Sequence, residues 1–280
     1  MITAYRQPKT LDEALGLIAR GARPVGGATS LYAGKSRVEG ELVDLADLGL
    51  SSIAIEKGGI VLGATCTLAT IAEAESLPGM EGALLRRAAR VPGTRPLRNV
   101  ITLGGNIAQV AFWADMPVVL LALDAQVEVS RAGEPSQRVE LGECFAPGKK
   151  AWDAGLITKV VVPTRQAICG FGYERFTRTK NDYSFATLCV TLRREGEVAK
   201  DVHVVVGALQ PRPFRVAEAE QMVEGKGLDL ALFEAVGRKL SEVVKVAPNL
   251  HASADYRREL AGVLCKRALQ SAFTWAMREA

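Results

Sequence analysis

The chain has few of the residues from which metal and nucleic-acid sites are usually built. Among 280 residues there are two histidines and five cysteines, and no two cysteines form a Cys-x-x-Cys pair. This spacing excludes a zinc or iron–sulfur centre on the chain. The 35 basic and 31 acidic residues nearly balance, and no basic run contains interleaved aromatic residues. Nucleic-acid binding is therefore not indicated.

Long apolar segments are also missing. The first residues, MITAYRQPKT, lack the apolar centre of a signal peptide. The longest apolar run, from Met116 to Leu123, is too short to span a bilayer. All five cysteines lie among apolar neighbours, as buried thiols do in a reducing compartment: Cys66, Cys144, Cys169, Cys189 and Cys265. These features predict a cytoplasmic protein with no membrane span.

Two common catalytic patterns are absent. No Gly-x-Gly-x-x-Gly follows a predicted strand, so a Rossmann dinucleotide site is not indicated. No serine has a nearby histidine that would activate it as a nucleophile. Any activity must therefore depend on another arrangement of residues.

The hydrophobic pattern predicts a mixture of helices and strands that changes character near residue 168. Residues 11–18 have helical spacing, and Thr10 with Glu13 forms a capping box. A hairpin is expected at Gly58-Gly59, and helices are expected at 67–77, 79–91 and 115–123, the last capped by Asp115. Beyond Arg165, three alternating segments predict antiparallel strands with a turn at Glu195-Gly196. Helices from residue 214 onward complete the chain.

Two glycine turns are the main functional signal. The first is Val25-Gly26-Gly27-Ala28-Thr29-Ser30, and the second is Thr102-Leu103-Gly104-Gly105-Asn106, which follows a strand-like run. Backbone N–H groups in a turn without Cβ atoms form a concave donor nest that suits the oxygens of a pyrophosphate. Each turn has hydroxyl or amide side chains beside it. The alternative is that both are ordinary tight turns.

A third polar cluster runs from Arg178 to Ser184. One interpretation is a polar loop that leads into the next strand. The other is a binding lip over a planar ligand, in which Lys180 and Asp182 bond its edge and Tyr183 packs on its ring.

Taken in order, these segments resemble the flavin-binding medium subunit of the molybdenum hydroxylases. This family includes the flavoprotein subunits of xanthine dehydrogenase and carbon monoxide dehydrogenase types. The resemblance covers nearly the whole chain and is densest at LRNVITLGGNIAQ and DMPVVLLALDA; it resumes at VGALQPRPFRVAEAE and ASADYRRELAGVLCKRAL.

The resemblance implies an α+β fold in two domains. Residues 1–168 would form an FAD-binding PCMH-type domain of the vanillyl-alcohol-oxidase kind, with subdomains at about 1–55 and 56–168. Residues 169–280 would form a small α+β C-terminal domain of the CO-dehydrogenase flavoprotein type. The implied FAD contacts are Val25, Gly26, Gly27, Ala28, Thr29, Ser30, Leu31, Thr102, Leu103, Gly104, Gly105, Asn106, Asp115 and Asp182, alongside Lys180 and Tyr183 from the polar cluster. The FAD diphosphate would then be what excludes side chains at Gly104 and Gly105.

The implied function is electron transfer within an oxidoreductase complex. FAD on this chain would pass electrons between the iron–sulfur clusters of a partner and an external acceptor or donor. A large subunit would carry the molybdenum cofactor and a small subunit the [2Fe-2S] clusters, in a heterotrimer or a dimer of heterotrimers. Neither glycine turn contains a histidine, so FAD is expected to be non-covalent. Two alternatives remain open: a stand-alone flavin oxidase or reductase, and a scaffold that has lost FAD.

The chain departs from the family pattern between the second glycine turn and Asp115. Where the family usually has Asn-Ala-Ser-Pro, this chain has Gln109-Val110-Ala111-Phe112, followed by Trp113. Phe112, Trp113 and Tyr183 would either reshape the flavin face or serve as packing residues.

Overall fold

The computed structural model describes residues 1–33, 38–109, 111–146, 152–165, 169–247 and 252–278. The chain divides into two units: residues 1–77, 94–109 and 124–163 form the first, and residues 78–93, 110–123 and 164–280 form the second. The expected domain boundary at residue 168 lies outside the described residues.

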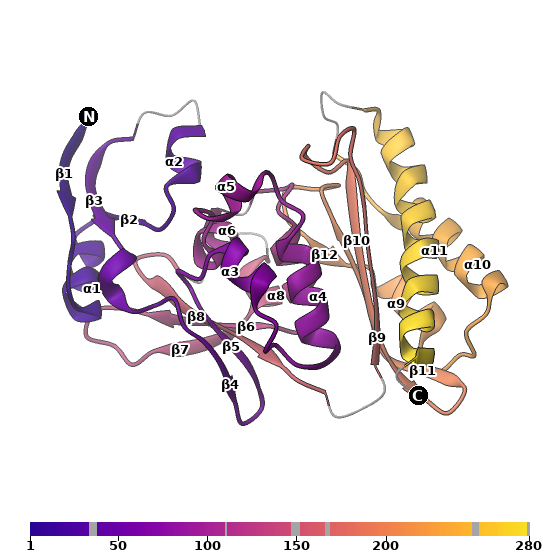
Figure 1. Ribbon diagram of the computed structural model, residues 1–280. Coiled ribbons are helices and arrows are strands. Elements are labelled where there is room, and N and C mark those ends of the chain that lie inside the picture. Colours follow the sequence, from indigo (N-terminus) through magenta and orange to yellow (C-terminus); the bar gives the residue numbers. More distant parts are fainter. Residues whose placement is uncertain (34–37, 110, 147–151, 166–168, 248–251, 279–280) are drawn as a thin grey trace. The chain divides into compact units, whose positions relative to one another are not determined.

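The first unit begins with a small parallel sheet and one covering helix (Figure 1). Its elements are β1 (Ile2–Arg6), α1 (Leu11–Ala19), β2 (Arg23–Val25), α2 (Thr29–Ala33), β3 (Gly40–Asp44) and the 3-10 helix η1 (Ala46–Leu48), with strand order β1-β3-β2. The predicted capping box at the start of α1 is confirmed: the Glu13 amide donates to the Thr10 hydroxyl over 3.2 Å. The Glu13 carboxylate in turn accepts from the Lys9 amide over 3.1 Å.

A second, antiparallel sheet completes the first unit. It has the order β4-β5-β8-β6-β7. The elements are β4 (Ile53–Glu56), β5 (Gly59–Gly63), α3 (Leu68–Glu73), α5 (Arg95–Arg98), α6 (Leu103–Gln109), β6 (Gln126–Ser130), β7 (Gln137–Glu140), α8 (Leu141–Cys144) and β8 (Leu156–Pro163). The hairpin predicted at Gly58-Gly59 joins β4 to β5.

The second unit is built on a four-stranded antiparallel sheet of order β12-β11-β10-β9. Its elements are α4 (Gly79–Ala89), α7 (Asp115–Ala122), β9 (Cys169–Phe176), β10 (Ala186–Glu195), β11 (Val198–Gly207), β12 (Phe214–Arg215), α9 (Ala217–Val223), α10 (Leu230–Val243) and α11 (Ala254–Arg278). The three strands predicted beyond Arg165 are confirmed as β9, β10 and β11, and β10 pairs with β11 across the Glu195-Gly196 turn.

Helices pack on both faces of this sheet because successive side chains of a strand point to opposite sides. On one face α11 lies so close to β9 that an ideal Cβ on Gly172 would lie 1.9 Å from the Ala268 carbonyl oxygen. On the other face α7 packs on β10, where the Thr191 hydroxyl donates to the Ala122 carbonyl over 2.8 Å. Residues of α4 and α7 therefore belong to the core of the second unit, although they lie in the first half of the sequence.

Three local expectations are revised or completed by the structure. Asp115 does not cap α7: Ala114 holds that position without a side-chain hydrogen bond, and Asp115 is the first helical residue. The helix expected from residue 214 is preceded by the short strand β12. All five cysteines are buried, and none forms a disulfide. No helix in the described part of the chain is long and apolar enough to cross a bilayer.

Candidate functional site

The two glycine turns lie against each other in the first unit. An ideal Cβ on Gly27 would lie 1.4 Å from the carbonyl oxygen of Val100, just before the second turn. The side chain of Thr102 lies between Gly26 of the first turn and Gly105 of the second. Its Oγ1 would lie 2.5 Å from a Cβ on Gly26 and 2.8 Å from a Cβ on Gly105. Turns separated by about 75 residues in sequence thus form one surface.

The second turn is the start of α6 rather than the end of a strand. The Thr102 hydroxyl accepts from the Gly105 amide over 3.3 Å, as an N-cap side chain does. The amides of Leu103 and Gly104 donate to the carbonyls of Cys66 and Ala64, each over 2.8 Å. These bonds fix the turn to the segment that follows β5.

A contact within the protein explains why residue 104 is a glycine. An ideal Cβ there would lie 2.8 Å from the Cβ of Ala64 and 3.0 Å from its carbonyl oxygen. Contact with Ala64 is therefore sufficient to exclude a side chain at Gly104. At Gly105 the backbone is exposed, and the nearest atom is the side chain of Thr102.

The first turn offers unused backbone donors. Within the described residues, the amides of residues 26–30 donate no hydrogen bond, while the Ala28 carbonyl accepts from Leu31. Ala28 has φ +57°, the left-handed conformation found in anion-binding nests. Gly26 is exposed and the next four residues are half-buried, so these donors lie at the surface. This donor set fits the oxygens of a pyrophosphate.

A buried acceptor beside the second turn also lacks a partner. Asn106 Oδ1 is buried and has no hydrogen bond within the described residues, and the same holds for Thr65 Oγ1. Buried polar atoms normally have partners, so these two atoms mark a place where a ligand with donors and acceptors fits. The three apolar positions predicted here, Val25, Leu31 and Leu103, are buried in the core, which leaves only their backbones to face a ligand.

Asp115 belongs to a buried polar network in the second unit. It is 2% exposed, its Oδ1 accepts from the Thr187 hydroxyl over 3.4 Å, and it lies 3.6 Å from Arg175 Nε. Burial raises the pKa of the Asp115 carboxyl, and the nearby Arg175 charge opposes that shift. The carboxylate therefore acts within this unit through Arg175.

Arg175 connects that network to the polar cluster at 178–184. Its Nε donates to Ser184 Oγ over 2.8 Å, and its Nη2 donates to the Asp182 carbonyl over 2.9 Å. Tyr183 is 50% exposed, and its ring packs on Trp113 with centroids 4.5 Å apart. Trp113 in turn meets the edge of Phe112 at 4.6 Å. Trp113 thus packs on the polar cluster through Tyr183, and Phe112 packs on Trp113. Val110, in the same segment, lies outside the described residues.

The predicted site residues fall into two groups. Residues 25–31 and 102–106 come together in the first unit, and Asp115, Lys180, Asp182 and Tyr183 belong to the second. Sequence reasoning missed Ala64, Val100 and Arg175, whose roles depend on contacts with distant segments. Within the described residues, no group of three or more His, Cys, Asp or Glu could hold a metal ion.

Two glycine turns with open backbone donors on an α+β unit are the arrangement expected of a protein that binds a dinucleotide. Comparison with known proteins identifies the family to which the chain belongs. Residues 1–165 match the family of the FAD binding domain in molybdopterin dehydrogenase, and residues 171–272 match the CO dehydrogenase flavoprotein C-terminal domain. The chain belongs to this family of FAD-binding medium subunits.

Relatives of similar length support the assignment. The glyceraldehyde dehydrogenase medium chain of Sulfolobus acidocaldarius is 28% identical over 95% of this chain and 97% of its own length. The carbon monoxide dehydrogenase medium chain of Afipia carboxidovorans is 27% identical over 96% of both chains. A chain of the cyanide-inactivated Cu,Mo-CO dehydrogenase superposes with a TM-score of 0.90 at 25% identity, covering 98% of this chain and 99% of that one. The predicted α+β fold, FAD cofactor and oxidoreductase role are thereby confirmed.

Proposed function

We propose that this chain is the FAD-carrying medium subunit of a molybdenum hydroxylase complex. It would pass electrons between the iron–sulfur clusters of a small subunit and an external acceptor or donor, while a large subunit holds the molybdenum cofactor. The observation that best supports this proposal is the single surface formed by the two glycine turns, where the amides of residues 26–30 remain free to donate. The expected assembly is a heterotrimer or a dimer of heterotrimers.

The residues of the first unit would hold the diphosphate. Amides of residues 26–30 would donate to its oxygens, and Asn106 would supply the polar contact that its buried Oδ1 lacks. Bound FAD supplies the ability to accept single electrons and release them in pairs. Thr102 would set the spacing of the two turns, because its hydroxyl touches both.

The residues of the second unit would shape the environment of the flavin ring. Lys180, Asp182 and Tyr183 are the proposed contacts. Asp115 would be a positioning residue, since it is buried and acts through Arg175 on the backbone of Asp182. This role differs from direct contact with the cofactor, and it explains why a buried carboxylate lies beside an arginine here.

The two alternative functions are less well supported. The relatives described above match over nearly their whole length and are medium chains, which favours a subunit over a stand-alone oxidase or reductase. An FAD-less scaffold would have no use for free amides at the surface of the first turn. We also propose a cytoplasmic location, which five buried thiols that form no disulfide support. The sequence domains 1–168 and 169–280 remain our proposed division, supported by family matches to 1–165 and 171–272.

The test is purification of the full chain together with its genomic neighbours. The expected result is a yellow complex that contains molybdenum, iron and one FAD per medium subunit, and acid precipitation releases all of the flavin into solution. Flavin retained in the precipitate would contradict non-covalent binding. Turnover of an organic substrate by the isolated chain, or a colourless chain after addition of FAD, would contradict the proposed role.

A further inference from the structure

A pocket of about 610 Å³ opens on the second unit, apart from the residues proposed to hold FAD diphosphate. It is lined by Ala83, Arg86, Arg87, Arg90, Val91, Phe171, Lys180 and Trp275. These residues come from α4 and the two residues that follow it, from β9 and α11, and from the loop between β9 and β10. The volume is in the range of pockets that take small organic ligands.

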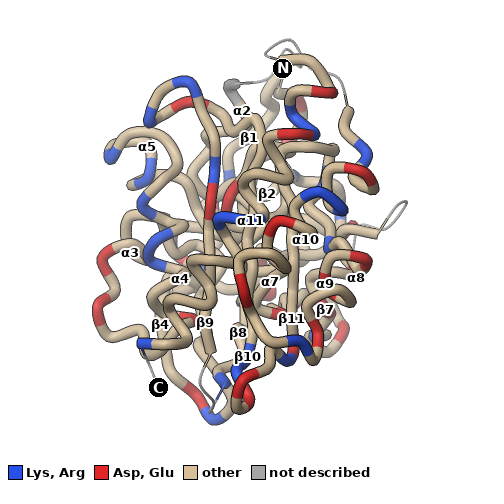
Figure 2. The backbone as a smooth tube through the Cα atoms, turned by 90° about the vertical axis from the view of Figure 1, so that its right-hand side faces the viewer, with Lys and Arg blue, Asp and Glu red and all other residues tan. Residues whose placement is uncertain are grey.

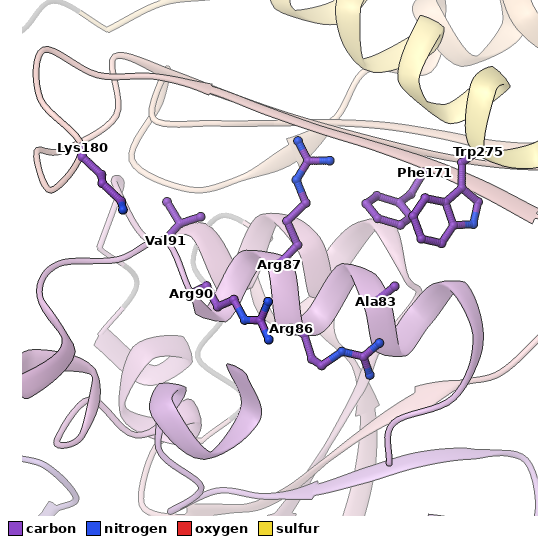
Figure 3. Close-up of a pocket in the computed structure, with 8 residues that line it drawn as sticks. All are labelled: Ala83, Arg86, Arg87, Arg90, Val91, Phe171, Lys180 and Trp275. Carbon is purple, nitrogen blue, oxygen red and sulfur yellow. The ribbon is translucent and has the colours of Figure 1, made fainter. Parts of the chain in front are cut away.

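The two ends of the pocket differ in chemistry (Figure 3). Lys180 and Val91 lie at one end, Phe171 and Trp275 at the other, and the arginines of α4 between them. Among the described lining residues every charged side chain is a cation. The pocket is therefore basic along most of its length and aromatic at one end.

Arg87 is held in place before any ligand arrives. Its Nη2 donates to the Tyr173 carbonyl over 2.8 Å and lies 3.8 Å from Glu174 Oε1. Its guanidinium carbon is 6.0 Å from the centre of the Phe171 ring. One of its five N–H donors is thus used, and the others remain for a ligand. A donor fixed in this way loses little conformational entropy on binding.

The basic end has unused charge. Lys180 makes no ion pair or side-chain hydrogen bond within the described residues. Figure 2 shows basic positions (blue) beside the α4 label; Arg86 lies in the last turn of α4, and Arg90 is the residue that caps its end, one turn later. Arginine matches the geometry of phosphate in particular.

The aromatic end suits a flat ring. The Phe171 and Trp275 rings are 4.5 Å apart at 45°, and Trp275 is half-buried, which leaves part of its indole at the surface. The small apolar side chain of Ala83 lies at this end as well. A planar ring gains from packing on an indole, and the attached anion would then lie among the arginines.

We propose that this pocket binds a ligand of the nucleotide class, with its ring at Trp275 and its phosphate on Arg87. The ligand is distinct from the FAD held by the glycine turns. A site of this kind would let a soluble phosphorylated compound associate with the medium subunit.

The test uses the full chain with saturating FAD, so that the flavin site is filled. Binding of adenosine 5′-monophosphate, adenosine and inorganic phosphate is measured by titration calorimetry for wild type, Arg87→Gln and Arg87→Lys. Lys226→Gln, which removes one exposed cation of the same unit, is the matched control. We expect the monophosphate to bind more tightly than either fragment, and Arg87→Gln to weaken its binding by about tenfold or more. Arg87→Lys, which keeps the charge but loses the fork of donors, should weaken it less. Lys226→Gln should bind as wild type does.

Fluorescence assigns the ring. The monophosphate should quench tryptophan emission in wild type, and Trp275→Phe should remove that quenching. Equal affinity in wild type and Arg87→Gln would overturn the proposal, as would phosphate binding as tightly as the monophosphate. Arg87→Lys guards against misfolding of Arg87→Gln, because it keeps the positive charge beside Glu174. A chain that binds the monophosphate but takes up no FAD would refute the flavin role and leave this site standing.

Discussion

The carbonyl oxygen of Val100 occupies the place that a side chain on Gly27 would need. An ideal Cβ on Gly27 would lie 1.4 Å from that oxygen, closer than any non-bonded contact. Because the obstacle is backbone, it cannot swing away as a flexible side chain could. The two turns can therefore lie this close only because residue 27 of the first turn has no side chain.

Gly27→Ala should abolish FAD retention and destabilise the first unit. Forcing the turns apart displaces the free amides of residues 26–30 and strains the packing, at a cost of several kcal/mol. Gly16→Ala is the control, because its Cβ would meet only Arg20 at 3.7 Å inside α1. It should keep FAD and stabilise the chain by up to about 1 kcal/mol. Flavin content and urea unfolding measure both effects; full FAD content in Gly27→Ala would contradict the site.

Asn106→Ala should have opposite effects on the FAD-free and FAD-bound protein. Without FAD it removes a buried acceptor that has no partner, so the free energy of unfolding should rise by about 1 kcal/mol. With FAD it removes a ligand contact, so affinity should fall by about tenfold. Thr65→Val removes the other unpartnered oxygen and shows whether both atoms face FAD. Thermal unfolding with and without FAD is the measurement, and equal shifts in both states would count against Asn106 as a contact.

Asp115→Asn should change how stability depends on pH. Burial raises the folded-state pKa of Asp115 above its ordinary value of 3.8, so the folded protein holds its proton more tightly than the unfolded chain. The stability of wild type relative to Asp115→Asn should therefore decrease as pH rises above 3.8 and level off beyond the raised pKa. Chemical unfolding of both proteins across this range provides the comparison. A difference that grows with pH would show that the Arg175 charge outweighs burial.

Arg257→Met should strongly destabilise the second unit. Arg257 is 1% exposed, and its guanidinium donates to the carbonyls of Phe185, Ala247 and Ala208. Removing it leaves three backbone acceptors without their donor, a loss of about 3 kcal/mol or more. Arg258→Met should cost less than about 1 kcal/mol, since its partner Asp255 is exposed. Urea unfolding followed by tryptophan emission distinguishes the two, and similar costs would contradict this account.

The local features of the fold could be predicted because their causes lie within a few residues. Thr10 and Glu13 define the start of α1 by themselves, and alternating residues with Glu195-Gly196 define the β10–β11 hairpin. The sequence also indicates that residue 104 must be a glycine, but it does not show that Ala64 is what excludes a side chain there. Ala64 lies 40 residues earlier, and nothing in the local pattern shows that the two segments touch.

The buried network could be predicted only in part for the same reason. Asp115 was recognised through the family pattern, but a pattern of residues along the chain does not report burial. Its partner Arg175 lies 60 residues further on, on β9, and looks like an ordinary strand arginine in the sequence. Trp113 stood out as unusual, and its contact with Tyr183 required the structure.

The interleaving of the two units restricts how this gene can change. Each unit is made of three segments, so the polypeptide passes from one to the other five times. Recombination near residue 165 would separate α7, whose eight residues are all buried, from the strands it covers. The halves recognised as separate families must therefore be inherited together, and domain shuffling between flavoproteins of this kind should exchange them only as a pair.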